Sequence, residues 1–317
     1  MQPSRPRLPK RALHGVLLLD KPLGLSSNDA LQKARRLLRA EKAGHTGTLD
    51  PLATGLLPLC FGAATKFSQL NLEADKCYLA TLKLGQRTST GDREGEVVEA
   101  RPVDFDTDRL HQALASLRGE IDQVPPMHSA LKVDGKALYQ LARAGVQVER
   151  APRRVTIHAL ELLSHEADSM QLHVHCSKGT YIRTLAEDLG ERLGCGAHLS
   201  ALRRTHSGPL SLEGALTLER LEGMSDAERI EQLQPPDLLL ADCPLIRLDS
   251  DEAGKLLAGM RRRTTAAAAS RVRAFGPEAR AFLGSARVAG GELIPERLLS
   301  PVELQTLLAG PPALGPN

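Results

Sequence analysis

The sequence predicts an α+β protein with a small β-domain at its C-terminal end, and three observations lead to that class. Apolar and polar residues alternate along 76–85 and within 155–176, as they do in strands with one buried face. Amphipathic helices are expected after Ser26, ending at Gly44, and after Thr107, because serine and threonine cap helices well and glycine often ends them. From about Pro244 the chain changes to short β-like runs, glycine turns and arginines.

The composition excludes several classes of protein. The chain has 317 residues, of which 42% are hydrophobic and 25% charged, as in globular proteins with one large and one small domain. Aromatic residues make up only 3%, which argues against a protein that stacks many bases on aromatic platforms. The net charge is only +3, so any surface that binds nucleic acid must be local. No run approaches the ~20 apolar residues of a membrane span.

Cysteine and histidine positions do not predict a metal site. The five cysteines are scattered without a Cys-x-x-Cys pair, which argues against a zinc ribbon and suits reduced thiols in the cytosol. His173, His175 and Cys176 resemble a ligand group at first sight. However, Leu172 and Val174 alternate with the histidines, so a strand with one solvent-exposed face explains them. We therefore expect no metal and a cytoplasmic protein.

A loop between Gly44 and Gly55 is the most distinctive stretch. Its three glycines and Pro51 argue against a regular helix or strand. It carries one imidazole, His45, and one carboxylate, Asp50. An isolated Asp-Pro pair is usually only a turn, and the run lacks the Gly-Lys-Ser/Thr ending of a phosphate-binding loop.

A second stretch, Ser177 to Leu189, predicts a helix with an unusual first turn. Thr180 is the expected N-cap, which puts Arg183 in the first turn. A cation there opposes the helix dipole by roughly 0.3–1 kcal/mol. Glu187 could pair with it, but only in the weaker orientation. Arg183 therefore needs another partner, and a buried carboxylate would supply one.

Both stretches resemble the TruB family of tRNA pseudouridine-55 synthases. The similarity rests on the Gly44–Gly55 loop and on the run Lys-Gly-Thr-Tyr-Ile-Arg-Thr at 178–184, and it extends from Gly15 to about Leu221. It implies a pseudouridine-synthase-type fold, in which a mixed, mostly antiparallel sheet has flanking helices and a small PUA-like β-domain follows. The family alternative is the RNA-guided archaeal and eukaryotic counterpart, which the insertion after residue 120 disfavours.

The resemblance also implies the chemistry. A uracil in the T-arm of tRNA, at U55, would be flipped out and isomerised, with no redox change and hence no cofactor. Asp50 would be the nucleophile at either ribose C1′ or pyrimidine C6, and both remain open. Arg183 would pair with Asp50 and keep it ionised in a dry pocket. Tyr78, on the buried face of its strand, would stack on the base and help to move the C5 proton.

Other residues are implied to bind the substrate. His45 would fill the space that the base leaves, and Leu202 would pack against the base. Lys21 lies in a Lys-Pro turn, and a structural role and a role in the site are equally expected for it. The same group also includes Tyr181 and Lys132. His128, Cys77 and Leu79 depart from the family pattern and bring some RNA contacts into question.

The expected organisation has four parts. These are a disordered basic tail at 1–14, a catalytic domain at 15–243 with an RNA-binding insertion at about 120–154, a PUA-like domain at 244–310 and a disordered tail at 311–317. We expect a monomer that binds tRNA, with no membrane and no obligatory protein partner. A tRNA-folding chaperone is the alternative function, but a binder has no need of a carboxylate like Asp50 in a phosphate-lined cleft. A metal-dependent hydrolase would need a ligand cluster that the sequence does not indicate.

Overall fold

The computed structural model describes residues 9–129, 131–133 and 135–310, without the side chains at 132, 133, 137, 139 and 143. Contacts divide the chain into two compact units. Unit 1 contains Met1–Asp50, Leu56–Glu73 and Pro209–Asn317, and unit 2 contains Pro51–Gly55 and Ala74–Gly208. The division therefore passes through the Gly44–Gly55 loop, directly after Asp50.

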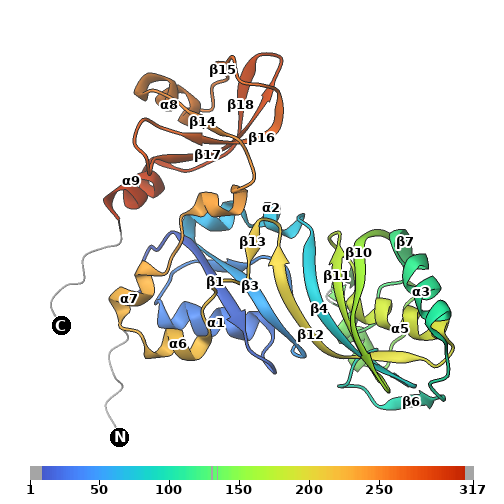
Figure 1. Ribbon diagram of the computed structural model, residues 1–317. Coiled ribbons are helices and arrows are strands. Elements are labelled where there is room, and N and C mark those ends of the chain that lie inside the picture. Colours follow the sequence, from blue (N-terminus) through green and yellow to red (C-terminus); the bar gives the residue numbers. More distant parts are fainter. Residues whose placement is uncertain (1–8, 130, 134, 311–317) are drawn as a thin grey trace, which may run out of the picture. The chain divides into compact units, whose positions relative to one another are not determined.

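Unit 2 is built on an antiparallel sheet with the strand order β12-β4-β11-β10-β7 (Figure 1). Residues Ala53–Gly55, at the start of β3, pair with β12 in the parallel sense. This mixed, mostly antiparallel sheet with its helices confirms the predicted fold class. The elements are β4 (Lys76–Leu84), β5 (Gln86–Thr88), β6 (Val97–Ala100), α3 (Thr107–Ser116), β7 (Gly119–Gln123), β8 (Lys132–Val133), β9 (Lys136–Ala137), α4 (Leu138–Arg143), β10 (Arg153–Glu166), β11 (Ser169–Cys176), α5 (Ile182–Leu193) and β12 (Ala197–Ser207).

The predicted strands of unit 2 are confirmed. Strand β4 alternates strictly between buried and half-buried residues, with Tyr78, Ala80, Leu82 and Leu84 on the buried face. Strands β10 and β11 pair as expected. Every second residue of β11 is buried from Met170 to Cys176, and β10 buries Val155, Ile157 and Leu160. One residue was not expected on the buried face. Lys76 begins β4 on the same face as Tyr78 and is only 6% exposed.

Unit 1 combines the N-terminal segments with the C-terminal third of the chain. Strand β3 lies beside β1 and also pairs with β2. The elements are β1 (Gly15–Lys21), α1 (Ser27–Leu37), β2 (Ala43–His45), β3 (Ala53–Phe61), η1 (Gly62–Lys66), α2 (Ser68–Leu72), β13 (Leu210–Ser211), α6 (Leu218–Gly223), α7 (Asp226–Glu231), η2 (Pro236–Leu240), β14 (Leu245–Arg247), α8 (Ser250–Leu257), β15 (Arg262–Arg263), β16 (Ala269–Phe275), β17 (Phe282–Ala289), β18 (Glu292–Leu298) and α9 (Pro301–Ala309).

Several predicted boundaries were wrong. Helix α1 ends at Leu37 rather than at Gly44, which instead lies in the short strand β2. Both ends of the Gly44–Gly55 run therefore belong to strands, and only the middle is a loop. Helix α3 is capped by Asp106 rather than by Thr107, because the Asp106 side chain accepts from the Arg109 N–H. The cap of α3 differs by one residue, because neighbouring polar residues compete for a cap. The end of α1 differs by more, because Gly44 lies in strand β2 instead of ending the helix.

The predicted small β-domain forms a five-stranded sheet with the order β14-β16-β17-β18-β15. Part of its core is shared with the N-terminal segments of unit 1. The rings of Phe67 and Phe282 have centroids 5.2 Å apart, and those of Phe275 and Phe282 are 5.4 Å apart. Val16 and Leu56 belong to the same buried cluster. Apolar packing therefore ties the C-terminal strands to the first third of the chain.

The expected basic tail is described only from Pro9. There, Arg11 donates its backbone N–H to Arg39 and accepts from Glu41. Its guanidinium pairs with Asp226 at 2.8 Å, and Leu13 is buried. Residues of the expected tail, from Arg11 on, therefore make defined contacts with unit 1. The expected tail residues 1–8 and 311–317 lie outside the described residues.

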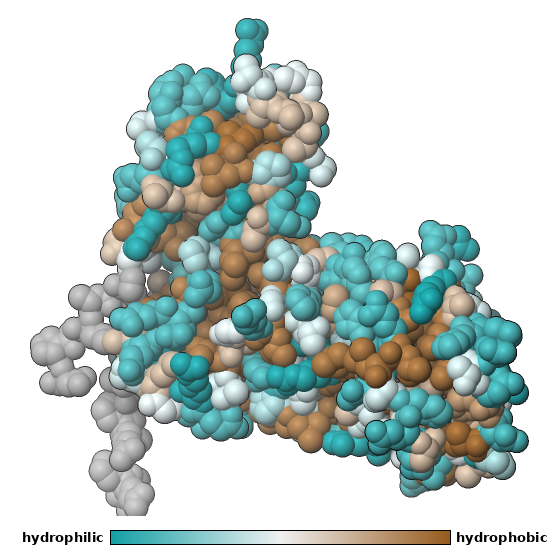
Figure 2. All heavy atoms as spheres, in the orientation of Figure 1, coloured by the Kyte–Doolittle hydropathy of each residue, from teal (hydrophilic) through white to brown (hydrophobic). Residues whose placement is uncertain are grey.

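On the face shown in Figure 2, apolar side chains lie among hydrophilic ones. Large exposed apolar residues such as Leu23 and Val302 are normal on a protein surface when they stand singly. Within the described part of the chain, no helix is long and apolar enough to cross a membrane.

We predict that Phe282→Ala lowers the free energy of unfolding by about 3–5 kcal/mol, because it removes the ring between Phe67 and Phe275 and leaves a cavity. Urea unfolding of the full chain measures this loss. Val302→Ala, at a side chain that is 71% exposed, is the control and should change little. Equal, small losses in both variants would show that the aromatic cluster does not hold the C-terminal strands.

Candidate functional site

The residue before Asp50 is fixed by the first residue of helix α1. The Ser27 hydroxyl accepts the Leu49 N–H at 2.7 Å and donates to the Leu49 carbonyl at 3.0 Å. Ser27 and Leu49 are buried, so these bonds do not exchange with water. The loop therefore cannot shift at Leu49 without breaking two buried hydrogen bonds, and this restricts the position of Asp50.

Lys21 supports the same arrangement from β1. Its ammonium group is buried and donates to the carbonyls of Pro22 at 2.9 Å and of Leu25 at 2.6 Å. These bonds close the turn that leads into α1 and so to Ser27. Of the two roles expected for Lys21, they favour the structural one.

His45 lies in β2 and is half-buried, opposite Leu59 of β3. The next residue, Thr46, is fully buried, and its hydroxyl donates to the Asn71 side chain at 2.6 Å. The Thr46 N–H donates to the Pro58 carbonyl at 3.1 Å. The loop is thus anchored at His45–Thr46 as well as at Leu49.

In unit 2, the other end of the loop lies very close to the backbone of β12 at Gly55, and we call this close approach the crossing. Gly55 has φ +97°, and a Cβ placed on it would lie 2.3 Å from the carbonyl oxygen of Arg204. Only glycine fits there, because it has no Cβ and tolerates this backbone conformation. Leu202 pairs with Ala53 and Arg204 with Gly55, so this crossing fixes the register between the loop and β12.

Tyr78 and Arg204 are directly opposite on β4 and β12. Arg204 is 1% exposed, and its side chain hydrogen-bonds to that of Tyr78. Burial lowers the pKa of Arg204, while Tyr78 acts in the opposite direction. The guanidinium therefore remains a buried cation that orients the phenol, which makes it a fixed positive charge beside Tyr78.

Lys76 lies on the same buried face, two residues before Tyr78. Burial lowers its pKa to about 8, and the nearby Arg204 acts in the same direction. Its ammonium group donates to the Ala74 carbonyl. Near neutral pH, Lys76 and Arg204 together give this face two buried cations.

Leu202 is half-buried on β12, opposite Ala80 of β4. Its carbonyl accepts from the Thr54 hydroxyl at 3.3 Å. Leu202 is therefore held in register with the loop, while part of its side chain remains exposed.

Arg183 is buried in the first turn of α5, 5% exposed. Its guanidinium donates to the carbonyls of Thr90 at 3.1 Å and of His128 at 2.6 Å. Its Nε lies 3.6 Å from a carboxylate oxygen of Asp92, which is 4% exposed. The sequence indicated that Arg183 needs a buried carboxylate as its partner. Asp92 is such a carboxylate, and it was not predicted from the sequence.

The two carbonyls that Arg183 holds belong to the wall of a pocket of about 320 Å³. His128, one of the departures from the family pattern, lines this pocket beside Met127. Glu187 also lines it, and burial raises the pKa of its carboxyl group. Arg183 thus shapes a pocket in unit 2 in addition to carrying charge.

Tyr181 is the N-cap of α5, where Thr180 was predicted. The amide side chain of Gln123 accepts the Tyr181 N–H at 3.0 Å and donates to its carbonyl at 3.3 Å. The Thr180 hydroxyl instead donates to the Ser177 carbonyl at 2.9 Å. Lys132 lies in β8, and its side chain is outside what the structure describes.

Unit 2 therefore brings together Tyr78, Leu202 and the end of the loop, while unit 1 holds Lys21, His45 and Asp50. The sequence did not identify Ser27, Lys76, Asp92 and Arg204 as part of either group. Only Lys76 had a usable signal, because the alternation that buries Tyr78 also buries Lys76.

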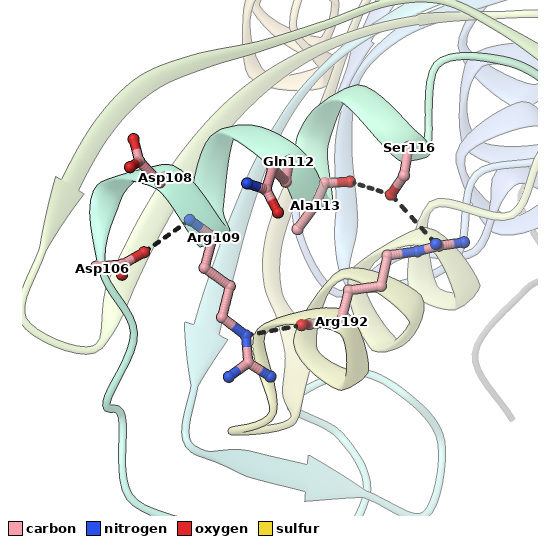
Figure 3. A pocket seen from close by; sticks show the side chains of 7 residues that line it. All are labelled: Asp106, Asp108, Arg109, Gln112, Ala113, Ser116 and Arg192. Atoms are coloured by element: carbon pink, nitrogen blue, oxygen red, sulfur yellow. Dashed lines mark hydrogen bonds between the residues drawn. The ribbon is translucent and has the colours of Figure 1, made fainter.

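A second hollow, of about 560 Å³, lies on helix α3 beside α5 (Figure 3). Its two arginines serve the packing of the helices. Arg109 donates to the Arg192 carbonyl at 3.1 Å, and Arg192 donates to the Ser116 hydroxyl at 3.2 Å. None of the predicted site residues lines it, so it is not a candidate for the chemistry.

The fold is shared with a solved protein. A chain in the crystal structure of a Cbf5-Nop10-Gar1 complex superposes with a TM-score of 0.69 and 26% identity, over 90% of this chain and 85% of that one.

The sequence comparisons are more specific. Residues 35–182 match the TruB family pseudouridylate synthase N-terminal domain, and residues 183–241 match the tRNA pseudouridylate synthase B C-terminal domain. The tRNA pseudouridine synthase B of Burkholderia lata is 60% identical over 302 residues, 93% of each chain. That of Verminephrobacter eiseniae is 56% identical over 98% of this chain and 96% of its own. The chain belongs to the TruB family of pseudouridylate synthases.

We predict that Gly55→Ala destabilises the protein more than a simple backbone effect would. The matched control is Gly214→Ala, because Gly214 also has a positive φ, +76°, but has open space around it. The control should lose about 1–2 kcal/mol through backbone strain. Gly55→Ala should lose clearly more, because the Arg204 carbonyl must move. Urea unfolding of both variants checks this, and equal losses would contradict the close crossing.

We predict a pH-dependent contribution from Lys76. Its folded pKa of about 8 is below the ordinary value of 10.5, so between these values the unfolded chain binds more protons than the folded one. The free energy of unfolding should therefore rise with pH across this window, relative to Lys76→Met. Urea unfolding near pH 8 and near pH 10.5 measures the difference. Lys136→Met, at an exposed lysine, is the control and should follow the wild type. Parallel pH profiles of the wild type and Lys76→Met would contradict the lowered pKa.

Proposed function

We propose that this protein isomerises uridine 55 in the T-arm of tRNA to pseudouridine. It is an isomerase of the tRNA pseudouridine synthase B type. The match to relatives of that name, at 60% identity over 93% of both chains, carries this conclusion. A tRNA-folding protein that does not depend on catalysis is the less favoured alternative, because it leaves the anchored Asp50 loop without a purpose.

Asp50 is proposed as the nucleophile. A carboxylate can add to ribose C1′ or to pyrimidine C6 without a cofactor, and either attack needs a fixed approach. Two features support this role. The Ser27 hydroxyl holds Leu49, directly before Asp50, and the crossing at Gly55 fixes the end of the same loop. A nucleophile between two anchored points loses little conformational freedom when the substrate binds.

Arg183 is proposed to pair with Asp50 and keep it ionised, since a neighbouring cation lowers a carboxyl pKa. Asp92 is a second carboxylate beside the same guanidinium. A loss of stability in Arg183→Ala would therefore not identify Asp50 as its partner, because breaking the buried Arg183–Asp92 pair is also costly. Activity measurements distinguish the two roles better than stability measurements do.

The remaining residues are proposed to receive the flipped nucleotide. Tyr78 would stack on the uracil, with its phenol oriented by Arg204, and Leu202 would pack against the base. His45 would occupy the space that the base leaves in the T-arm. Tyr181, Lys21 and Lys132 complete the proposed substrate-binding group.

The proposed organisation follows from the same reading. A catalytic domain at 15–243 would bind the T-arm with its insertion at about 120–154. The arginine-rich strands at 244–310 would form a PUA-like RNA-binding domain, because arginine pairs with phosphate. We further propose that the protein acts as a monomer in the cytoplasm without an obligatory protein partner.

We predict that the wild type converts U55 of unmodified tRNA and that Asp50→Asn does not, because an amide cannot act as the nucleophile. A pseudouridine assay at single-nucleotide resolution measures both. Asp104→Asn, at an exposed carboxylate, is the matched control and should keep full activity. If the wild type binds tRNA but leaves U55 unchanged, the chaperone alternative is favoured. Conversion by Asp50→Asn at the wild-type rate would exclude Asp50 as the nucleophile.

A further inference from the structure

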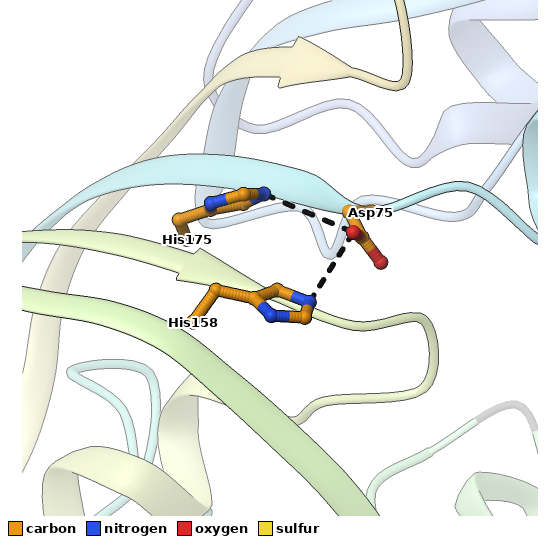
Figure 4. A group of neighbouring side chains, drawn as sticks. All are labelled: Asp75, His158 and His175. Atoms are coloured by element: carbon orange, nitrogen blue, oxygen red, sulfur yellow. Dashed lines mark ion pairs between the residues drawn. The ribbon is translucent and has the colours of Figure 1, made fainter. Parts of the chain in front are cut away.

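Three ligand-type side chains meet on unit 2, and none of them belongs to the residues assigned above. Asp75 directly precedes β4, His158 lies on β10 and His175 on β11 (Figure 4). The His158 Nε2 is 3.2 Å from an Asp75 carboxylate oxygen, and the His175 Nε2 is 3.9 Å from the same oxygen. One ligand atom from each residue lies within 4.8 Å of the other two.

The sheet itself produces this grouping. Strand β11 lies between β4 and β10, and His175 is opposite Cys77, close to Asp75 along β4. The register between β10 and β11 shifts between Ile157 and Ala159, so His158 lies at an irregularity. Such bulges re-aim side chains. The two imidazole rings have centroids 4.7 Å apart, which confirms that both histidines face the same point.

The spacing is close to that of a metal site. Ligand atoms about 2.0–2.2 Å from a tetrahedral zinc ion lie about 3.3–3.6 Å from one another. The His158–Asp75 distance of 3.2 Å is near this range without any movement. The His175–Asp75 distance of 3.9 Å needs only a small side-chain rotation. All three side chains are between about a third and half exposed, so an ion and a bound water can reach them.

We propose that Asp75, His158 and His175 bind a divalent transition-metal ion, with zinc as the ion of best fit. Two imidazoles and one carboxylate are a donor set that suits zinc, and water completes a tetrahedral site. The ion would tie the start of β4 to β10 and β11. Its role is structural, because the bound ion would lie among the strands rather than at Asp50. The expectation of no metal rested on His173, His175 and Cys176, and of these three residues only His175 belongs to the present group.

The chain offers a matched control on the same two strands. His173 of β11 pairs with Glu161 of β10 at 3.4 Å, which is also a histidine–carboxylate contact. The His173–Glu161 pair offers one imidazole and one carboxylate, whereas the group of Asp75, His158 and His175 offers two imidazoles and one carboxylate. If a surface ion pair were enough to bind metal, both places would do so.

The test is a zinc titration of the full-length protein after removal of metal with a chelator, with the cysteines kept reduced. Competition with a chromophoric zinc chelator gives the affinity. We expect one zinc ion per chain and a higher unfolding temperature with zinc. Loss of a residue that only hydrogen-bonds to a metal ligand typically weakens metal affinity by about 10–100-fold. Loss of the ligand itself should cost at least as much, so His158→Gln and His175→Gln should each weaken zinc binding by about 10–100-fold or more. His173→Gln should bind as the wild type does.

Two further measurements keep the result decisive. Asp75→Asn provides a third variant of the site, and far-UV circular dichroism without metal establishes that each variant is folded. Cobalt replaces zinc and reports its ligands, and a site of nitrogen and oxygen donors gives no thiolate charge-transfer band. Wild-type zinc affinity in both His158→Gln and His175→Gln would overturn the proposal. So would a thiolate band, which would place the metal at a cysteine.

Discussion

The close crossing of Gly55 and Arg204 is the constraint on which the site depends. The backbones approach so closely that no side chain fits at residue 55, and this fixes the register between the loop and β12. On its other side, β12 pairs with β4, where Arg204 is opposite Tyr78. The backbone of Arg204 therefore contacts the end of the loop that carries Asp50, while its side chain orients the Tyr78 phenol. Sites of this kind are precise because they rest on strand pairing rather than on mobile side chains.

Unit 2 also buries cations that most proteins leave at the surface. Arg204 and Lys76 lie on one face of the sheet, and Arg183 lies in the first turn of α5. Burial affects the two residue types differently. Lysine gives up its proton more easily, as the pKa of about 8 for Lys76 shows, whereas arginine keeps its charge. The two buried arginines therefore keep a permanent charge inside unit 2.

The sequence predicted the fold class, the strands of unit 2 and the buried face of Tyr78, because strand alternation is a local signal. It also indicated from the helix dipole that Arg183 needs a carboxylate, but it could not identify Asp92, which lies far away along the chain. Arg204 was missed for a related reason. Two adjacent arginines usually indicate an exposed segment, and only the pairing with β4 reveals that Arg204 is enclosed. Two helix starts were wrong by one residue, because neighbouring residues can serve as the cap. The end of α1 was wrong because Gly44, a residue type that often ends helices, lies in strand β2.

The shared core in unit 1 also bears on how this protein can change. Phe275 and Phe282 of the C-terminal strands pack in one cluster with Phe67 and Leu56 from the N-terminal segments. Lys66 adds a hydrogen bond to the Leu298 carbonyl at 3.1 Å. A gene fusion that replaced the C-terminal strands with those of a distant relative would bring together two halves of a core that had not evolved together. Recombination and domain grafting should therefore succeed only when the segment around Phe67 is exchanged with them.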